Sequence, residues 1–172
     1  MAAVVVTAVG ATGMVSAGAD TARPAPAAQQ SSTKGNAASQ AVAGNPYTPK
    51  EVCGSGYYVV KDKGGIGGKA KRPVFFPNKA TVWGYVYLMY NDSTGKNCVA
   101  TIKTEKVGKK TYMFAALRVK GKSWKADDGT YKYYAGPVKK KAAGKCVKYR
   151  GFIDLGGGFY ATGGREKWGN CG

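Results

Sequence analysis

The sequence predicts an all-β fold: a small disulfide-bonded antiparallel β-sandwich or barrel that follows a signal peptide and a disordered linker. From Tyr47 onward, short runs rich in aromatic and β-branched residues alternate with turns rich in glycine, a pattern typical of antiparallel β proteins. All four cysteines lie in this part of the chain, and an even number of cysteines in a small exported protein indicates disulfides. The residues before Tyr47 are apolar at first and then low in complexity.

The clearest strand is predicted at residues 80–90. Its alternate residues form two faces that are both largely apolar or aromatic: Val82, Gly84, Val86 and Leu88 on one, and Trp83, Tyr85, Tyr87 and Met89 on the other. A strand of this composition is expected to be covered on both sides. Residues 91–95 have the composition of a turn, so residues 98–102 should complete a hairpin.

The other expected strands are shorter. They are predicted at residues 57–60, 112–119, 131–134, 146–149 and 158–160. Residues 113–117 can also be read as a helical turn, and that alternative stays open. Asp127-Asp128-Gly129 is predicted to be a hairpin turn, and Gly136-Pro137 is expected to break the strand pattern.

The N-terminal residues 1–19 are predicted to be a signal peptide. The run from Ala2 to Val15 carries no charge and is followed by Ala17-Gly18-Ala19, a small-x-small cleavage pattern. No lysine or arginine precedes the run, which suggests a true start further upstream; a buried Ala/Val helix is the alternative. The run is too short for a transmembrane segment. Residues 20–46 are then expected to be a disordered Ala/Gly/Ser/Pro-rich linker, and residues 47–172 a single β domain.

Four cysteines allow three disulfide connectivities. We favour Cys53–Cys98 with Cys146–Cys171, because each bond then joins segments that are near one another in sequence. A zinc site of four thiolates is formally possible, but the wide spacing of the cysteines does not resemble a zinc knuckle.

The chain is strongly basic and contains no histidine. Its 27 Lys+Arg against 9 Asp+Glu give a net charge of +18, which will dominate its contacts with other surfaces. Three basic groups are predicted to bind polyanions from exposed turns and loops: Lys69, Lys71 and Arg72; Lys106, Lys109 and Lys110; and Lys139, Lys140, Lys141 and Lys145. The alternative is that the lysines serve only solubility and the interleaved aromatic residues only sheet packing. For an exported protein, wall polyanions or anionic lipid are more plausible partners than a specific nucleic acid.

Catalytic and cofactor motifs are missing. Residues 64–69 are glycine-rich but fail the phosphate-loop spacing, and Ser55 lies outside a GxSxG motif and lacks a histidine base. A pair of carboxylates could in principle cleave a glycosidic bond, yet nothing in the spacing of the domain's acidic residues suggests such a pair. Those residues are Glu51, Asp62, Asp92, Glu105, Asp127, Asp128, Asp154 and Glu166. We therefore expect no enzyme activity, no cofactor and no metal.

A series of short blocks resembles the spore-associated protein A family of spore-forming actinobacteria. The blocks are Tyr-Thr-Pro-Lys-Glu-Val-Cys-Gly-Ser-Gly-Tyr at 47–57, Val-Tyr-Leu-Met-Tyr-Asn at 86–91, Gly-Lys-Asn-Cys-Val at 95–99, Tyr-Tyr-Ala-Gly-Pro-Val at 133–138, Cys-Val-Lys at 146–148 and the terminal Cys-Gly. Their order, with all four cysteines included, carries the resemblance over residues 47–172. It implies a small secreted protein found with the spore or aerial cell surface, with no assigned activity and no site residues to transfer.

The leading hypothesis is a secreted, non-catalytic and monomeric protein at the spore or cell surface, held by its basic surface to anionic wall or spore-surface polymers. The alternative is a secreted cationic antimicrobial or protease-inhibitor-like protein. A hydrolase acting on wall polysaccharide is a third hypothesis.

Overall fold

The computed structural model describes residues 44–78 and 80–172, so the predicted signal peptide and nearly all of the predicted linker lie outside the described residues. The elements in chain order are α1 Pro49–Cys53, β1 Tyr58–Val59, the 3₁₀ turn η1 Ile66–Gly68, β2 Lys71–Phe75, β3 Val82–Asn91, β4 Lys96–Lys103, β5 Thr111–Val119, β6 Trp124–Tyr131, β7 Tyr134–Lys141, β8 Val147–Gly156 and β9 Phe159–Gly169. Among these residues no helix is long and apolar enough to cross a membrane.

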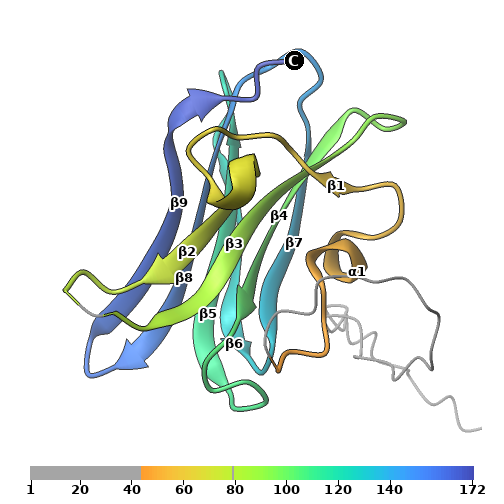
Figure 1. Cartoon of the computed structure of the whole chain (residues 1–172). Coiled ribbons are helices and arrows are strands. Elements are labelled where there is room, and N and C mark those ends of the chain that lie inside the picture. Colours follow the sequence, from red (N-terminus) through yellow and green to blue (C-terminus); the bar gives the residue numbers. More distant parts are fainter. Residues whose placement is uncertain (1–43, 79) are drawn as a thin grey trace, which may run out of the picture. The chain divides into compact units, whose positions relative to one another are not determined.

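The strands form one antiparallel sheet that curls into a nearly closed barrel (Figure 1). The strand order is β6-β5-β8-β9-β2-β3-β4-β7, and β1 pairs with the free part of β3. This confirms the all-β prediction and shows that the fold is a barrel and not a sandwich. It also shows that residues 112–119 are strand, not helical turn.

β3 is covered on both sides, as its alternation predicts. Val86 and Leu88 lie in the main core inside the barrel, together with residues of β5 and β8. Tyr87 and Met89 point the other way, into a second apolar cluster on the outside of the sheet. The outer cluster exists because the N-terminal segment of the domain folds back over β3 and β4.

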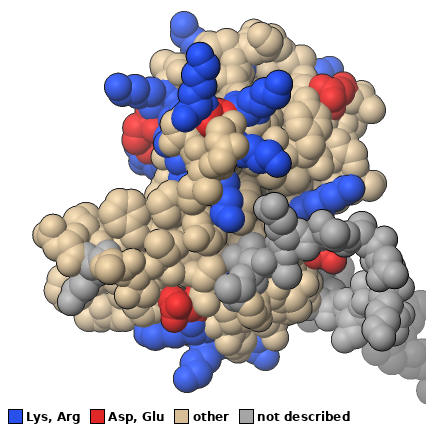
Figure 2. Space-filling view, in the orientation of Figure 1, with Lys and Arg blue, Asp and Glu red and all other residues tan. Residues whose placement is uncertain are grey.

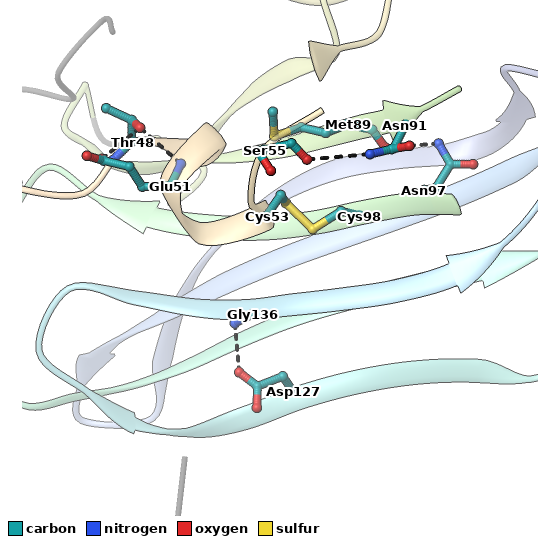
Figure 3. The surroundings of a disulfide bond; sticks show 10 residues. All are labelled: Thr48, Glu51, Cys53, Ser55, Met89, Asn91, Asn97, Cys98, Asp127 and Gly136. Atoms are coloured by element: carbon teal, nitrogen blue, oxygen red, sulfur yellow. Dashed lines mark hydrogen bonds between the residues drawn. A yellow bond between two sulfur atoms is a disulfide. The ribbon is translucent and has the colours of Figure 1, made fainter. Parts of the chain in front are cut away.

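That segment contains α1, which the sequence analysis missed. Thr48 and Glu51 form a capping box in which each side chain accepts a hydrogen bond from the other residue's backbone, and Pro49 takes the first helical position. The helix ends at Gly54, whose φ of 96° favours glycine. The Cys53–Cys98 disulfide then fastens the helix to β4 (Figure 3).

The structure confirms the favoured disulfide pairing. Cys146 is bonded to Cys171, and no cysteine is free, which excludes the four-thiolate zinc site. The second bond joins the two open ends of the β8–β9 hairpin, since Cys146 directly precedes β8 and Cys171 follows β9. The sequence had indicated two short strands here, but the hairpin is long, with Gly157 and Gly158 in its turn at φ of 64° and 83°. Glycine is suited to such positive φ angles.

Two expected interruptions of the strand pattern were wrong. Asp127-Asp128-Gly129 lies inside β6, and Gly136-Pro137 lies inside β7. These are the two edge strands of the sheet, and an edge tolerates proline because its free side needs no backbone donor. β6 and β7 are not paired by a backbone ladder. Between them, Asp127 Oδ2 accepts a hydrogen bond from the Gly136 N–H at 2.7 Å (Figure 3). The predicted turn residue therefore helps to hold the two edges together.

Lys103 is fully buried at the end of β4. Its ammonium donates to the backbone oxygen of Lys109 at 2.6 Å, to Thr111 Oγ1 at 2.7 Å and to the backbone oxygen of Tyr131 at 3.1 Å. None of these acceptors carries a charge. Burial, and secondarily the charge of Lys106, lowers the pKa of Lys103 to about 8.

This lysine predicts a stability that rises with pH. Between pH 8 and 10, the unfolded chain retains a proton that folded Lys103 releases, so raising the pH favours folding. We expect the free energy of unfolding of the wild type to increase by about 1–2 kcal/mol from pH 7.5 to 9.5. Lys103→Met should remove most of that increase in urea unfolding, whereas Lys109→Met, which removes an exposed lysine, should keep it. Equal slopes in the wild type and Lys103→Met would contradict this role.

Candidate functional site

One end of the barrel gathers most of the exposed lysines. Because neighbouring strands are antiparallel, the β3–β4, β5–β6 and β7–β8 connections lie at the same end, together with the loop before β2 and the C-terminus (Figure 1). We call this the basic end and define it as residues 60–70, 91–96, 119–125, 139–148 and 164–172.

The cations of the basic end greatly exceed its acids. Figure 2 shows Lys and Arg side chains crowding the upper part of the molecule, where Figure 1 places these segments. Its acidic residues are Asp62, Asp92 and Glu166. Its cations are Lys61, Lys63, Lys69, Lys96, Lys120, Lys122, Lys125, Lys139, Lys140, Lys141, Lys145, Lys148, Arg165 and Lys167.

The lysines of the basic end have no acidic partners in the part of the chain that the structure describes. Every ion pair among the described residues is made by an arginine: Arg72 and Arg165 with Asp62, at 2.8 and 3.2 Å, and Arg150 with Glu166. Burial alone would raise the pKa of Asp62, but the hydrogen bonds from Arg72 and Gly64 and the nearby charge of Arg165 lower it overall. Two of the three acids are thus occupied by arginines, which leaves the lysine charges uncompensated.

Lys122, Lys125 and Lys140 form a cluster across the gap between β6 and β7. Lys140 Nζ donates to the Ser123 backbone oxygen at 2.5 Å, and Lys125 Nζ approaches the Lys139 oxygen at 3.5 Å. Desolvation and the charges of Lys122 and Lys125 lower the pKa of Lys140. An anion bound here would relieve that repulsion.

The structure separates the three basic groups predicted from sequence. Lys139, Lys140, Lys141 and Lys145 belong to the basic end, as does Lys69. The first three of them are strand residues of β7, not turn residues as expected. Lys139 and Lys140 are half-buried: Lys139 Nζ lies 5.1 Å from the centre of the Tyr57 ring, and Lys140 Nζ donates a hydrogen bond to the Ser123 oxygen just before β6.

The other predicted residues are placed differently. Lys71 and Arg72 are half-buried in β2, so the expected loop position was wrong for them too. Lys71 Nζ lies 4.2 Å from the centre of the Tyr85 ring, and Arg72 is paired with Asp62. Lys106, Lys109 and Lys110 lie on the β4–β5 loop, at the opposite end of the barrel.

A pocket of about 680 Å³ opens beside the basic end and is lined partly by its residues. It is walled by β1, the β3–β4 hairpin, the β7–β8 turn and the C-terminal segment. Its lining residues are Tyr58, Val60, Lys61, Tyr90, Asp92, Asn97, Ala142, Gly144, Asn170, Cys171 and Gly172. The Cys146–Cys171 bond, together with a 2.9 Å hydrogen bond from Asn170 Nδ2 to the Lys61 oxygen, holds the C-terminal wall in place.

The pocket combines aromatic rings with polar groups. Tyr58 is 48% exposed, and its ring meets that of Tyr90 edge to face at 6.4 Å between centroids. The Tyr58 hydroxyl donates to Asp92 Oδ1 at 3.1 Å. Desolvation and this hydrogen bond raise the pKa of Tyr58, so the hydroxyl stays neutral. Asn170 Oδ1 is buried without a hydrogen-bond partner among the described residues.

A strip of aromatic residues is exposed elsewhere, on the outer face of β5, β8 and β9. Phe114 and Phe152 are stacked at 4.7 Å between ring centroids, and Tyr112 and Tyr160 contact Phe152 at 5.8 and 5.4 Å. This strip lies on a different part of the barrel from the pocket, and its Tyr160 is 46% exposed.

The acidic residues considered for hydrolysis mostly have structural partners. Glu51 caps α1, Asp62 and Glu166 bind arginines, and Asp92 binds Tyr58. The other bonded carboxylates are those of Asp127, Asp128 and Asp154, which accept hydrogen bonds from Gly136, Tyr112 and Gly156 respectively. Within the described chain, no group of three or more Cys, Asp or Glu side chains is placed to hold a metal ion.

Sequence reasoning missed two parts of this site. Lys122 and Lys125 are separated from residues 139–145 in sequence but lie beside Lys140 in the curled sheet. The three lysines of Lys-Gly-Lys-Ser-Trp-Lys at 120–125 were the sequence signal that could have identified this fourth basic group. The pocket had no local signal, because its residues come from four segments that are far apart in sequence.

Comparison with known proteins gives one informative match. Spore-associated protein A of Streptomyces coelicolor is 41% identical over 118 residues, which is 68% of this chain and 66% of the relative. The matched part thus spans about two thirds of the length of that curated relative. No family model and no solved structure matches the chain.

Proposed function

This chain belongs to the spore-associated protein A family, and we propose that it is a secreted, non-catalytic protein of the spore or cell envelope, held to anionic envelope polymers by its basic end. The name of the Streptomyces relative associates that protein with spores. The two disulfides support export, because such bonds persist in oxidising compartments outside the cytosol.

The observation that carries the proposal is that no acidic residue within residues 44–78 and 80–172 pairs with a lysine of the basic end. Lysines that are neutralised within the protein would offer little to a polyanion. Here Lys96, Lys141 and Lys145 are exposed on neighbouring turns and strand ends, and Lys96 lies directly opposite Lys141 in the sheet. A repeating anionic polymer can contact several of these charges at once and release counterions as it binds.

The non-catalytic part of the proposal is supported by the engagement of the carboxylates. Seven of the eight carboxylates in the domain bond to other groups of the described chain, and the eighth, Glu105, is exposed without such a partner. A single free carboxylate cannot supply the pair that a glycosidase needs.

The proposal predicts salt-dependent retention on spores. Purified disulfide-bonded protein mixed with washed spores should be mostly bound in 20 mM NaCl and mostly released in 1 M NaCl, where the Debye length falls to about 3 Å. Bound and free protein can be quantified by immunoblot after sedimentation. Protein that stays free at low salt, or that stays bound at 1 M NaCl, would overturn the electrostatic attachment.

A further inference from the structure

We infer that the pocket of the basic end binds a sugar residue of an anionic glycan, so that this end recognises carbohydrate and does not merely attract negative charge. This rests on the proposed function, because it assigns a ligand class to the same end of the barrel. The size of the pocket, about 680 Å³, lies within the usual range for small-ligand sites and is sufficient for a short oligosaccharide.

The aromatic corner of the pocket fits one face of a sugar ring. A pyranose presents apolar C–H groups on its faces and hydroxyls around its rim. Tyr58 and Tyr90 form a corner of two rings, and nearly half of Tyr58 is open to solvent. A rigid aromatic surface of this kind can pack against the apolar face of a sugar while its hydroxyl stays hydrogen-bonded.

The polar group beside this corner suits hydroxyls. The Asp92 carboxylate accepts one hydrogen bond from Tyr58 and has further lone pairs for ligand hydroxyls. This acceptor argues against a bare phosphate or carboxylate as the occupant, because the Asp92 carboxylate would repel it.

The charge at the rim suits an acidic glycan over a neutral one. Lys61 lines the pocket, and Gly144, which also lines it, is followed directly by exposed Lys145. A polymer with a sugar seated on Tyr58 would bring its acidic groups to these lysines. The pocket and the lysines therefore make separable contributions, one dependent on the sugar and the other on charge.

The test compares polymers that carry the same acidic group with and without sugars. Binding of the disulfide-bonded protein to polygalacturonate, hyaluronan and alginate is measured against polyglutamate by biolayer interferometry in 0.3 M NaCl. The wild type should bind at least one of the polysaccharides about 10-fold or more tightly than polyglutamate. Tyr58→Ala should abolish that preference while leaving polyglutamate binding unchanged. Asp92→Asn should also abolish it, with polyglutamate binding equal to or slightly tighter than that of the wild type because a repelling carboxylate is removed. Tyr160→Ala, which removes a similarly exposed tyrosine from the aromatic strip, should retain it.

The outcomes separate this inference from the proposed function. Equal binding of the wild type to polyglutamate and to every polysaccharide would overturn the sugar site but leave electrostatic attachment standing. Loss of the preference in Tyr160→Ala but not in Tyr58→Ala would also overturn it, since the sugar would then lie on the aromatic strip. Absence of binding to all four polymers even in 20 mM NaCl would overturn the proposed function itself.

Discussion

Replacing both Cys53 and Cys98 by alanine is expected to destabilise the domain by about 4 kcal/mol. The bond closes a loop with a sequence separation of 45, and the chain-entropy model gives about 4 kcal/mol for a loop of that length. Both cysteines are fully buried in the outer cluster, so their loss also loosens α1 from β4. A typical domain is stable by only about 5–15 kcal/mol. Urea unfolding followed by tryptophan fluorescence measures the loss.

The second disulfide provides the matched control. Cys146–Cys171 closes a shorter loop, with a separation of 25, and Cys171 is exposed. Replacing this pair by alanine should therefore cost less, about 3.5 kcal/mol or below, and should leave the amide protons of α1 as protected from exchange as in the wild type. A Cys53→Ala/Cys98→Ala double variant within 1 kcal/mol of the wild type would contradict the role given to the first bond.

Neutralising four lysines of the basic end is expected to weaken binding to spores by about 100-fold or more. Lys96, Lys122, Lys141 and Lys145 are exposed, and none of them makes an ion pair within the described chain. A lysine near an anionic surface contributes about 1 kcal/mol, so replacing all four by glutamine removes a large part of the attraction. Binding isotherms on washed spores in 50 mM NaCl measure the change.

The opposite end of the barrel supplies a variant of equal charge. Glutamine at positions Lys106, Lys109, Lys110 and Lys132 lowers the net charge by the same amount, but on the β4–β5 and β6–β7 loops. This variant should bind within about 3-fold of the wild type. Equal losses in the two variants would show that only net charge matters and that the basic end is not a site.

Features of the fold that depend on local pattern were predictable from sequence. The alternation of residues 80–90 gave both faces of β3, because a strand repeats every two residues whatever its neighbours are. The disulfide pairing was also predictable, since each bond joins segments that are near one another in sequence.

Features that depend on sheet closure were not predictable. Asp127, Asp128 and Gly129 have turn composition, yet they lie in β6, where they pair in register with β5. The Asp127 carboxylate in addition accepts a hydrogen bond from Gly136 on the other edge strand. The five-residue helix α1 was missed although Thr48 and Glu51 carry its capping signature; so short a helix is stabilised mainly by its packing and by the Cys53–Cys98 bond.

The candidate site was predictable in kind but not in place. The count of lysines indicated a polyanion-binding surface, but only the curled sheet shows that Lys122 and Lys125 join Lys140, whereas Arg72 is occupied by Asp62. Linear clusters of charge therefore identified the chemistry without identifying which residues act together.

The salt dependence of spore binding tests most directly whether uncompensated lysines on one end of the barrel hold the protein to its envelope. The affinity of the wild type and of the Lys96, Lys122, Lys141 and Lys145 glutamine variant is measured from 50 to 300 mM NaCl and plotted as log K against log [NaCl]. A steep negative slope is expected for the wild type and a slope shallower by about 2–3 for the variant, by analogy with the counterions released per contact on nucleic acids. A flat line for the wild type, or parallel lines for the two proteins, would contradict the account.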